Sequence, residues 1–502
     1  MVNIDRSAID SFVSSFLHNS SPDATKFSSV DVDPHALPIN HFTRNFGTMV
    51  FADIWTPESI RKKRKRRSGP GYTPEDRCNS LFYLNYIQPA GADVSMEVSI
   101  RNEGSKLGKR FRRRFRVPYC IFEEICRSMI EEGFYSAGKY KNGWPKVPLE
   151  LLVLASLRLL GSGCTFDLVE EFTNVAQETI RLFFQKKFCR WGRDLSKRMI
   201  RLPENKREMR HVVGLYERIG LPGCVGSVDC VHLVWDKCPA GFLSQCKGKE
   251  KHATLSFQAV VLHTKKILAL SQFFAGCTND KTIARYDVAI RKIRGSSEEM
   301  VNLEWGAFDK DGVQKREKGA YYICDGGYHY WQELIAPFKS QIPGSQMERW
   351  SANLESARKD VECTFGILKK RFLFLKNPIE MHSPERIDDA FRTCASIHNW
   401  LHDYDGWDDW EGRAGIVTED DIMIEYDPCD VSNRVYSATS SYHGFEGNFT
   451  RSQMRRMDRR AYRFDDYDEL LSERTLYEER RLVLIDHFNL MMHNRTIQCK
   501  TR

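Results

Sequence analysis

The sequence contains no CxxC pair of cysteines, no long apolar run and no internal repeat. Its 15 cysteines are scattered singly, which argues against a disulfide framework or a zinc ribbon and is typical of a reducing compartment. The N-terminal stretch lacks the charged and then apolar pattern of a signal peptide, and no apolar run approaches the length that crosses a bilayer. We therefore expect an intracellular, soluble protein that does not bind a membrane.

The sequence does contain enough apolar residues for folded cores, and an excess of positive charge. Of its 502 residues, 41% are hydrophobic and 12% are aromatic, which predicts two or more packed domains. The net charge is +8, and the cations are clustered instead of evenly spread. Clustered cations favour a polyanion as the partner.

The first basic cluster interrupts residues 1–108, which have few apolar runs and are expected to form a partly disordered basic arm. Like charges in such a block repel one another, so the block cannot fold on itself. We interpret it as a nuclear localisation signal, with phosphate contact and a solvated linker as the alternatives. Its members are Arg61, Lys62, Lys63, Arg64, Lys65, Arg66 and Arg67.

Residues 109–200 are predicted to form a helical domain that opens with a second basic cluster, KRFRRRFR. Two short helices with a turn near Asn174 have the pattern of a helix-turn-helix, in which residues 176–187 would be the recognition helix. The alternative is a helical bundle that only packs beside the next domain. The side chains expected to face DNA are Gln177, Glu178, Arg181 and Gln185.

Three apolar runs open the next domain, which we place at residues 205–402. The run GCVGSVDCVHLVW, which contains Asp229, predicts a strand that is buried on both faces. Residues 254–264 and 266–276 follow at spacings typical of an antiparallel meander. A lone carboxylate in a buried strand needs a partner, so Asp229 is a candidate functional residue.

A helix, a further strand and a long helix complete this domain. Ile283, Tyr286 and Ile290 have helical spacing, and AYYICDGGYHYW predicts a strand that ends near Asp325. The last helix, SANLESARKDVECTFGILKKRF, places Glu362 beside its apolar stripe. The residues of that stripe are Leu354, Val361, Phe365 and Leu368.

This order of elements is that of the ribonuclease-H-like nucleases and transposases, an α/β fold with a mixed sheet flanked by helices. The fold brings two strand-borne aspartates and one helix-borne acid to one edge of the sheet. Three like charges there repel unless hard cations lie between them, and magnesium prefers oxygen ligands. We therefore predict a site for two Mg²⁺ or Mn²⁺ ions that cuts phosphodiesters, with Asp229, Asp325 and Glu362 as its catalytic residues.

Five motifs carry a family resemblance. GSVDCVH, GKEKHATLSFQAVV, FAGCTND, YYICDGGY and VECTFGILKKRF occur in this order within residues 110–400. Together they resemble the successive motifs of the PIF/Harbinger transposase superfamily, the plant-transposon type of DDE endonuclease. The resemblance implies a nuclear DNA-cutting enzyme and a separate Myb-like DNA-binding protein as partner.

The resemblance also implies roles for individual acids. Asp229 matches the first catalytic aspartate of the family, and Glu362 matches the glutamate. Asp280 and Asp325 both match acidic positions, and we favour Asp325 because it ends a strand. Asp280 is then the runner-up, or an auxiliary metal or substrate ligand, or merely a helix cap. His329 stands where the family often has proline, which puts the geometry of that turn in doubt.

Further cations lie near the predicted catalytic edge. Lysines follow the first strand, and three cations end the glutamate helix, where Arg358 is also placed to pair with Glu362. Both sets suit contacts to DNA phosphates, with solvated loop lysines and a capped helix end as the alternatives. These candidates are Lys247, Lys249, Lys251, Lys369, Lys370 and Arg371.

The composition changes beyond the nuclease domain. Residues 403–447 are acidic and turn-rich, which predicts a flexible linker, and residues 448–502 combine a basic segment with a C-terminal helix. That helix is expected at 475–492, opened by a capping box from Thr475 to Glu478. It could dock on the core, bind a partner or pair with a second copy of the chain.

Three functional hypotheses follow from these patterns. The first is a DDE transposase that cuts DNA at transposon ends and joins the 3′-hydroxyls to target DNA. The second is a domesticated, transposase-derived nuclear factor that binds DNA or chromatin without cutting. The third is a ribonuclease-H-like enzyme that acts on RNA.

Overall fold

The computed structural model describes residues 71–91, 95, 98–141, 143–248, 251–339, 342–407 and 467–494. The predicted localisation signal at 61–67 lies outside these residues, as does most of the predicted acidic linker. Within the described residues, no helix is both long enough and apolar enough to cross a membrane.

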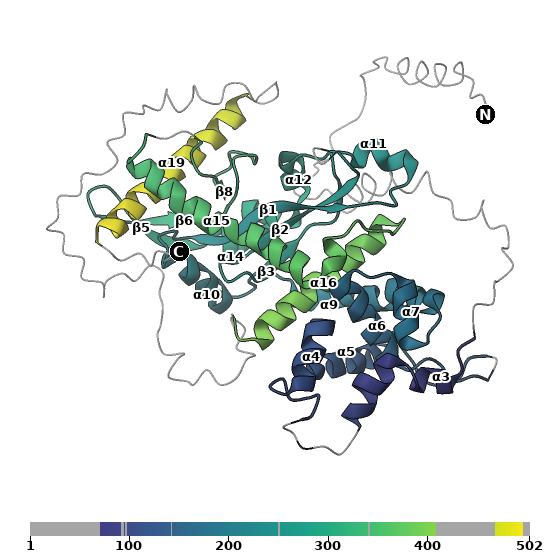
Figure 1. Ribbon diagram of the computed structural model, residues 1–502. Helices are drawn as coiled ribbons and strands as arrows, with labels where there is room; N and C mark the ends of the chain where they lie inside the picture. Colours follow the sequence, from purple (N-terminus) through teal and green to yellow (C-terminus); the bar gives the residue numbers. More distant parts are fainter. Residues whose placement is uncertain are drawn as a thin grey trace, which may run out of the picture. The chain divides into compact units, whose positions relative to one another are not determined.

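Helices make up the regular structure of the described chain before residue 218 (Figure 1). Their ends carry ordinary caps: the Ser105 hydroxyl accepts from the Gly108 amide at 2.8 Å, and Asn174 turns the chain with a φ of 50°. These helices are α3 (Pro74–Cys78), α4 (Lys106–Phe115), α5 (Tyr119–Glu131), α6 (Leu149–Ser162), α7 (Phe166–Thr173), α8 (Gln177–Phe183), α9 (Cys189–Met199) and α10 (Lys206–Glu217).

The predicted recognition helix is only partly observed. Helix α8 ends at Phe183 and continues as a π-helical turn, Phe184–Phe188. Ile180 is buried as expected, but the expectation that Gln185 faces outward is wrong. Its side-chain Oε1 accepts a 2.6 Å hydrogen bond from the Arg386 guanidinium, so Gln185 faces the protein interior.

Within the described residues, six strands form one mixed sheet with the order β3-β2-β1-β7-β8, and β4 also pairs with β2. The β1–β2 and β2–β3 pairs are antiparallel, as the meander predicted, whereas β1–β7 and β7–β8 are parallel. The strands are β1 (Cys224–Val234), β2 (Thr254–Val261), β3 (Ile267–Leu270), β4 (Phe274–Ala275), β7 (Tyr321–Ile323) and β8 (Leu334–Ile335).

The predicted strand at 266–276 is two strands. The chain leaves the sheet after Leu270, because the Ser271 hydroxyl turns back and accepts a 2.9 Å hydrogen bond from the Gln258 amide. It rejoins β2 further along as β4. The side-chain bond thus replaces one backbone bond of this pair, while the Ser271 amide still donates to the Gln258 carbonyl at 2.8 Å.

The predicted helix around Ile283 is also interrupted. Helix α12 (Asp280–Tyr286) ends at Asp287, whose side chain accepts from the Ile290 amide and caps α13 (Val288–Arg291). Ile283 and Ile290 are buried as expected, but Tyr286 is 44% exposed because the break turns it outward.

Three helices cover the sheet. Helix α15 (Gln346–Arg371) crosses it in Figure 1 and packs against β1 and β2, while α10 packs against β1. Helix α16 (Pro384–Tyr404) packs against α9 and β3. The predicted apolar stripe of α15 is buried, which confirms the amphipathic pattern. The remaining short helices are α11 (Leu243–Cys246) and α14 (Glu298–Val301).

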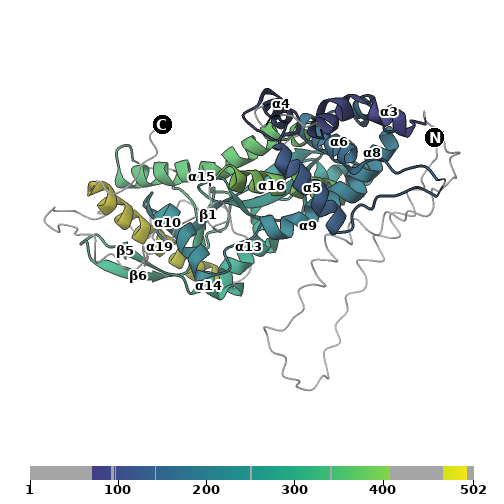
Figure 2. The same ribbon diagram turned by 90° about the horizontal axis from the view of Figure 1, so that it is seen from below.

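A two-stranded ribbon and a C-terminal helix lie beside the sheet. The ribbon, β5 (Glu304–Phe308) and β6 (Gln314–Lys318), was not anticipated from the sequence. Helix α19 (Tyr467–His493) packs against β5 and α15, and it lies beside the ribbon in both views (Figures 1 and 2). It starts before Thr475, whose hydroxyl bonds to the Leu471 carbonyl inside the helix, so the predicted capping box is wrong.

Candidate active site at the edge of the sheet

Asp229 and Asp325 are brought together by neighbouring parallel strands. Ser227 of β1 lies opposite Ile323 of β7, and each aspartate follows two residues further along its chain. Because side chains alternate along a strand, the two carboxylates reach the same side of the sheet. Asp325 Oδ1 also accepts from the Gly327 amide at 2.8 Å, which fixes its direction.

Helix α15 adds Glu362 through a shared arginine. Arg358 is 7% exposed, and its guanidinium lies 2.7 Å from Glu362 Oε1 and 3.4 Å from Asp229 Oδ2. It also bonds Glu355 at 2.6 and 2.9 Å. The expected pair with Glu362 is therefore confirmed, and Arg358 links the helix-borne acids to the strand-borne one.

The contacts to Glu355 and Asp229 were missed. The three-residue spacing of Glu355 and Arg358 on one helix could have predicted the first. No local pattern predicts the second, because the partners are 129 positions apart in the sequence.

The carboxyl of Asp229 has a strongly raised pKa. Burial raises the pKa of its carboxyl to about 7, and the negative charges of Asp325 and Glu362 act in the same direction. The Cys230 amide, which donates to Asp229 Oδ1 at 2.7 Å, and the Arg358 guanidinium oppose that rise. A further positive charge beside such a desolvated carboxylate would stabilise its ionised form.

Asp280, the first residue of α12, also lies near Asp325. A Cβ placed on Gly327 would lie 2.9 Å from Asp325 Oδ1 and 3.4 Å from Asp280 Oδ2, so this glycine leaves room for both carboxylates. After burial, Asp280 is the largest influence that raises the pKa of the Cys230 thiol. Cys230 follows Asp229 and so points to the opposite face of β1. Asp280 therefore lies near both Asp325 and Cys230.

The donor set fits a hard divalent cation, because every candidate ligand is a carboxylate oxygen. Among the residues that the structure describes, no three acid, histidine or cysteine side chains lie close enough together to hold one ion. Arg358 supplies the positive charge between Asp229 and Glu362 in this conformation. A cation shared by these acids would compete with that guanidinium.

Only part of the basic end of α15 is free to meet a ligand. Lys370 is exposed, whereas Lys369 donates to the His232 carbonyl at 3.1 Å. Arg371 contacts His398 Nδ1 at 3.1 Å, and burial lowers the pKa of its guanidinium.

The lysine-bearing loop lies beside the segment that leads to Asp280. Lys247 and Lys251 are exposed, and the Cys277 amide donates to the Gln245 carbonyl at 3.1 Å, which joins the loop to that segment. Lys249 lies outside the described residues. The loop that carries these two lysines is thus hydrogen-bonded to the chain three residues before Asp280.

Arg181 is distant in sequence from these groups and already has partners. It pairs with Glu178 at 2.6 Å and bonds Gln185 at 3.3 Å. His329 is buried, stacks on Trp331 at 4.2 Å and bonds the Lys281 carbonyl at 3.0 Å. His329 therefore packs within the turn after Asp325, at the position where the family often has proline.

The segment that carries these acids is similar in sequence to known proteins. Residues 197–407 match the sequence model of a family described as plant transposon protein. A curated relative from Arabidopsis thaliana, named Protein Antagonist of Like Heterochromatin Protein 1, is 22% identical over 313 residues, which cover 58% of this chain and 73% of the relative. No solved structure matches the chain. All four acids of the site lie within the segment that matches the family.

Proposed function

We propose that the chain is a metal-dependent DNA endonuclease of the DDE type, on the premise that residues 197–407 match the family described as plant transposon protein, as the five motifs predicted. The proposal assigns a ribonuclease-H-like core to the mixed sheet and its helices. One observation carries it: Asp229 and Asp325 meet on neighbouring strands, and Arg358 ties Glu362 of α15 to them. A carboxylate as desolvated as that of Asp229 is costly unless a cation or hydrogen bonds compensate it.

Asp229, Asp325 and Glu362 would hold two Mg²⁺ or Mn²⁺ ions, with Asp280 as an auxiliary ligand. Such ions activate a water or a 3′-hydroxyl and stabilise the leaving oxygen in an in-line displacement. Arg358 keeps Glu362 and Asp229 directed at one another before the ions bind. Lys247, Lys251 and Lys370 are exposed and suit the phosphates of the bound strand.

The biological role that we propose is transposition. The same acids would serve cutting at transposon ends and joining of 3′-hydroxyls to target DNA, because only the nucleophile differs between the two steps. We propose a nuclear location, a Myb-like DNA-binding partner and a homo-oligomer that holds two transposon ends.

Nicking of a labelled terminal-repeat duplex in Mg²⁺, with the partner added, tests the proposal. We expect Asp229→Ala, Asp325→Ala and Glu362→Ala to lose more than the 10- to 100-fold that removal of an outer-shell group costs. Asp280→Ala should lose less, and Asp311→Ala, an exposed acid beyond β5, should cut like the wild type. Full activity of Asp325→Ala with an inactive Asp280→Ala would instead assign the second ligand to Asp280.

A second candidate rests on the curated relative. Its name describes an antagonist of Like Heterochromatin Protein 1, and by analogy this chain would be a chromatin-binding factor that does not cut. A folded wild type that binds DNA but gives no nicks in Mg²⁺ or Mn²⁺ would favour this candidate. Divalent-dependent nicking that Asp229→Ala abolishes would rule it out.

A further inference from the structure

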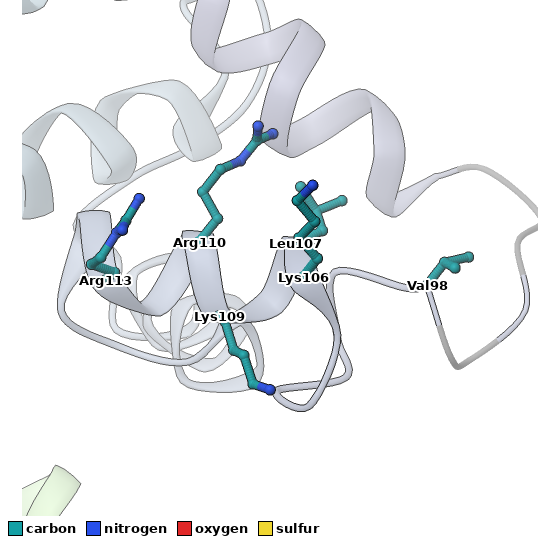
Figure 3. A pocket seen from close by; sticks show the side chains of 6 residues that line it. All are labelled: Val98, Lys106, Leu107, Lys109, Arg110 and Arg113. Atoms are coloured by element: carbon teal, nitrogen blue, oxygen red, sulfur yellow. The ribbon is translucent and has the colours of Figure 1, made fainter.

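Helix α4 carries a row of cations on its exposed side. Lys106, Lys109 and Arg113 are exposed, whereas Phe111 on the inner side is fully buried. Lys106, Arg110 and Arg113 extend to the same side of the helix, as Figure 3 shows, and Lys109 extends to the other side. The four- and three-residue spacing places all four residues on one strip of the helix surface, from which the Lys109 side chain diverges.

The row lines a hollow in the surface. Together with Leu107 and Val98, the four cations surround a volume of about 600 Å³. A second hollow of about 160 Å³ adjoins the first through Arg110 and is lined also by Arg114 and Arg158. No carboxylate of the described residues lines either hollow.

These positive charges are not neutralised within the described part of the chain. Lys106, Lys109 and Arg113 have no carboxylate of a described residue within 4.0 Å. Arg112 of the same helix, in contrast, pairs with Glu103 and lies 2.6 Å from Asp405. Arg112 therefore has a structural role in this helix, whereas Lys106, Lys109 and Arg113 face outward.

The positive charges of these residues also destabilise helix α4 itself. Lys106 occupies the first helical position, where the helix dipole disfavours a cation, and the first turn contains no acid. Lys106 and Arg110 form a like-charge pair four residues apart, as do Lys109 and Arg113. A polyanion bound to this face would offset that repulsion.

We infer that this α4 basic face, defined as Lys106, Lys109, Arg110 and Arg113, binds the phosphate backbone of double-stranded DNA. The inference rests on the proposed function, because it takes DNA as the substrate. The eight residues from Lys106 to Arg113 span about 10 Å, which is seven rises of an α-helix, and phosphates of one strand follow every 3.4 Å or so along the duplex axis. The row thus reaches about three successive phosphates.

This contact is separate from the carboxylate site. Helix α4 packs against α5 and α6, neither of which carries an acid of the site. Contacts to phosphates position a duplex without reading its sequence. The α4 basic face therefore gives the protein a second contact with the DNA, away from the phosphodiester bond that is cut.

Salt-dependent binding of the full-length chain to a labelled random-sequence duplex tests the inference. The variant is Lys106→Gln/Lys109→Gln/Arg113→Gln, which leaves Arg110 on the ring of Tyr86. The control is Lys310→Gln/Lys315→Gln/Arg316→Gln, which removes the same charge from exposed positions of the ribbon. Fluorescence anisotropy is measured between about 50 and 200 mM salt.

We expect the α4 variant to bind about tenfold or more weakly and to lower the slope of log K against log salt by about three, one phosphate for each cation lost. Its thermal unfolding should occur at the wild-type temperature or above, because the like-charge pairs are gone. The control should keep most of the wild-type slope.

Four results would overturn the inference. They are an unchanged slope in the α4 variant, an equal loss in the control, no duplex binding by the wild type, and an α4-dependent slope seen only with double-stranded RNA. Nicking by the same wild-type preparation reports separately on the proposed function. Nicking with an unchanged α4 slope would reject the α4 basic face and keep the endonuclease.

Discussion

At the scale of single residues, burial of acids dominates the electrostatics of this protein. Asp229, Asp287 and Asp389 are all desolvated, and burial raises the pKa of each, to about 7 for the first and about 6 for the other two. Asp389 has Arg193 at 3.0 Å as a partner, and Asp229 has Arg358. For Asp287 the main compensation comes from backbone amides of the helix that it caps.

Asp287→Asn should stabilise the protein at neutral pH. The folded-state pKa of Asp287, about 6, lies above its ordinary value of 3.8, so the native state binds this proton more tightly and loses stability as pH rises between the two values. Asparagine retains a capping oxygen without the charge. At pH 7 we expect a gain of up to about 3 kcal/mol in the free energy of unfolding.

Urea unfolding at a series of pH values measures this effect. Below the ordinary pKa of 3.8 the variant and the wild type should be equally stable, because both side chains are then neutral. The exposed Asp311→Asn serves as the control and should change little at any pH. A gain for Asp287→Asn that is the same at every pH would contradict the electrostatic explanation.

At the scale of elements, α9 and α16 approach unusually closely at one glycine. A Cβ on Gly192 would lie 2.1 Å from Thr393 Oγ1 and 2.5 Å from two carbons of the same side chain. Thr393 in turn donates to the Cys189 carbonyl at 3.2 Å, across the same interface. Because the threonine is buried and hydrogen-bonded, it cannot move aside at low cost.

Gly192→Ala should therefore destabilise the protein, although alanine is the better helix former. We expect a loss of about 1–3 kcal/mol from overpacking. Gly366→Ala in α15 is the matched control, since nothing lies within 4 Å of its added Cβ, and it should gain up to about 1 kcal/mol. Equal stability of the two variants in urea unfolding would show that the α9–α16 contact is looser than described.

At the scale of the whole molecule, the C-terminal helix is part of the main core. Tyr477 and Leu484 of α19 are buried among residues of β5, β7 and α15. Arg480 donates to the Lys318 carbonyl at 2.5 Å, and the Arg481 guanidinium stacks 3.4 Å from the Phe338 ring. Of the three roles considered for this helix, docking on the core is the one that the structure shows.

Leu484→Ala should lower the stability of the entire core by about 2–5 kcal/mol, because it removes a fully buried side chain. Leu476→Ala, at a position that is 47% exposed, should cost little. Urea unfolding followed by tryptophan fluorescence should remain a single transition, since Trp305 and Trp350 share the core with Leu484. A separate early transition in Leu484→Ala would mean that α19 unfolds independently.

Much of the site was predictable from local patterns. The periods of two and of about 3.6 residues located β1, β2 and α15, and isolated acids in apolar surroundings marked Asp229 and Glu362. The break at Asp287 and the start of α19 were missed. Asp287 caps a new helix in the middle of the predicted one, and the Thr475 hydroxyl bonds back to the Leu471 carbonyl within α19 instead of capping its start.

Local sequence patterns were enough to indicate most of the helices and strands, where the charges cluster and which acids are candidates, because these depend on neighbours a few positions away. Only the tertiary structure decided that Arg358, which local spacing already pairs with Glu362, also reaches Asp229, and that α19 covers β5 and α15. Such contacts join segments more than a hundred residues apart. They form only where the packing of the whole core offsets the entropy of closing the chain between them.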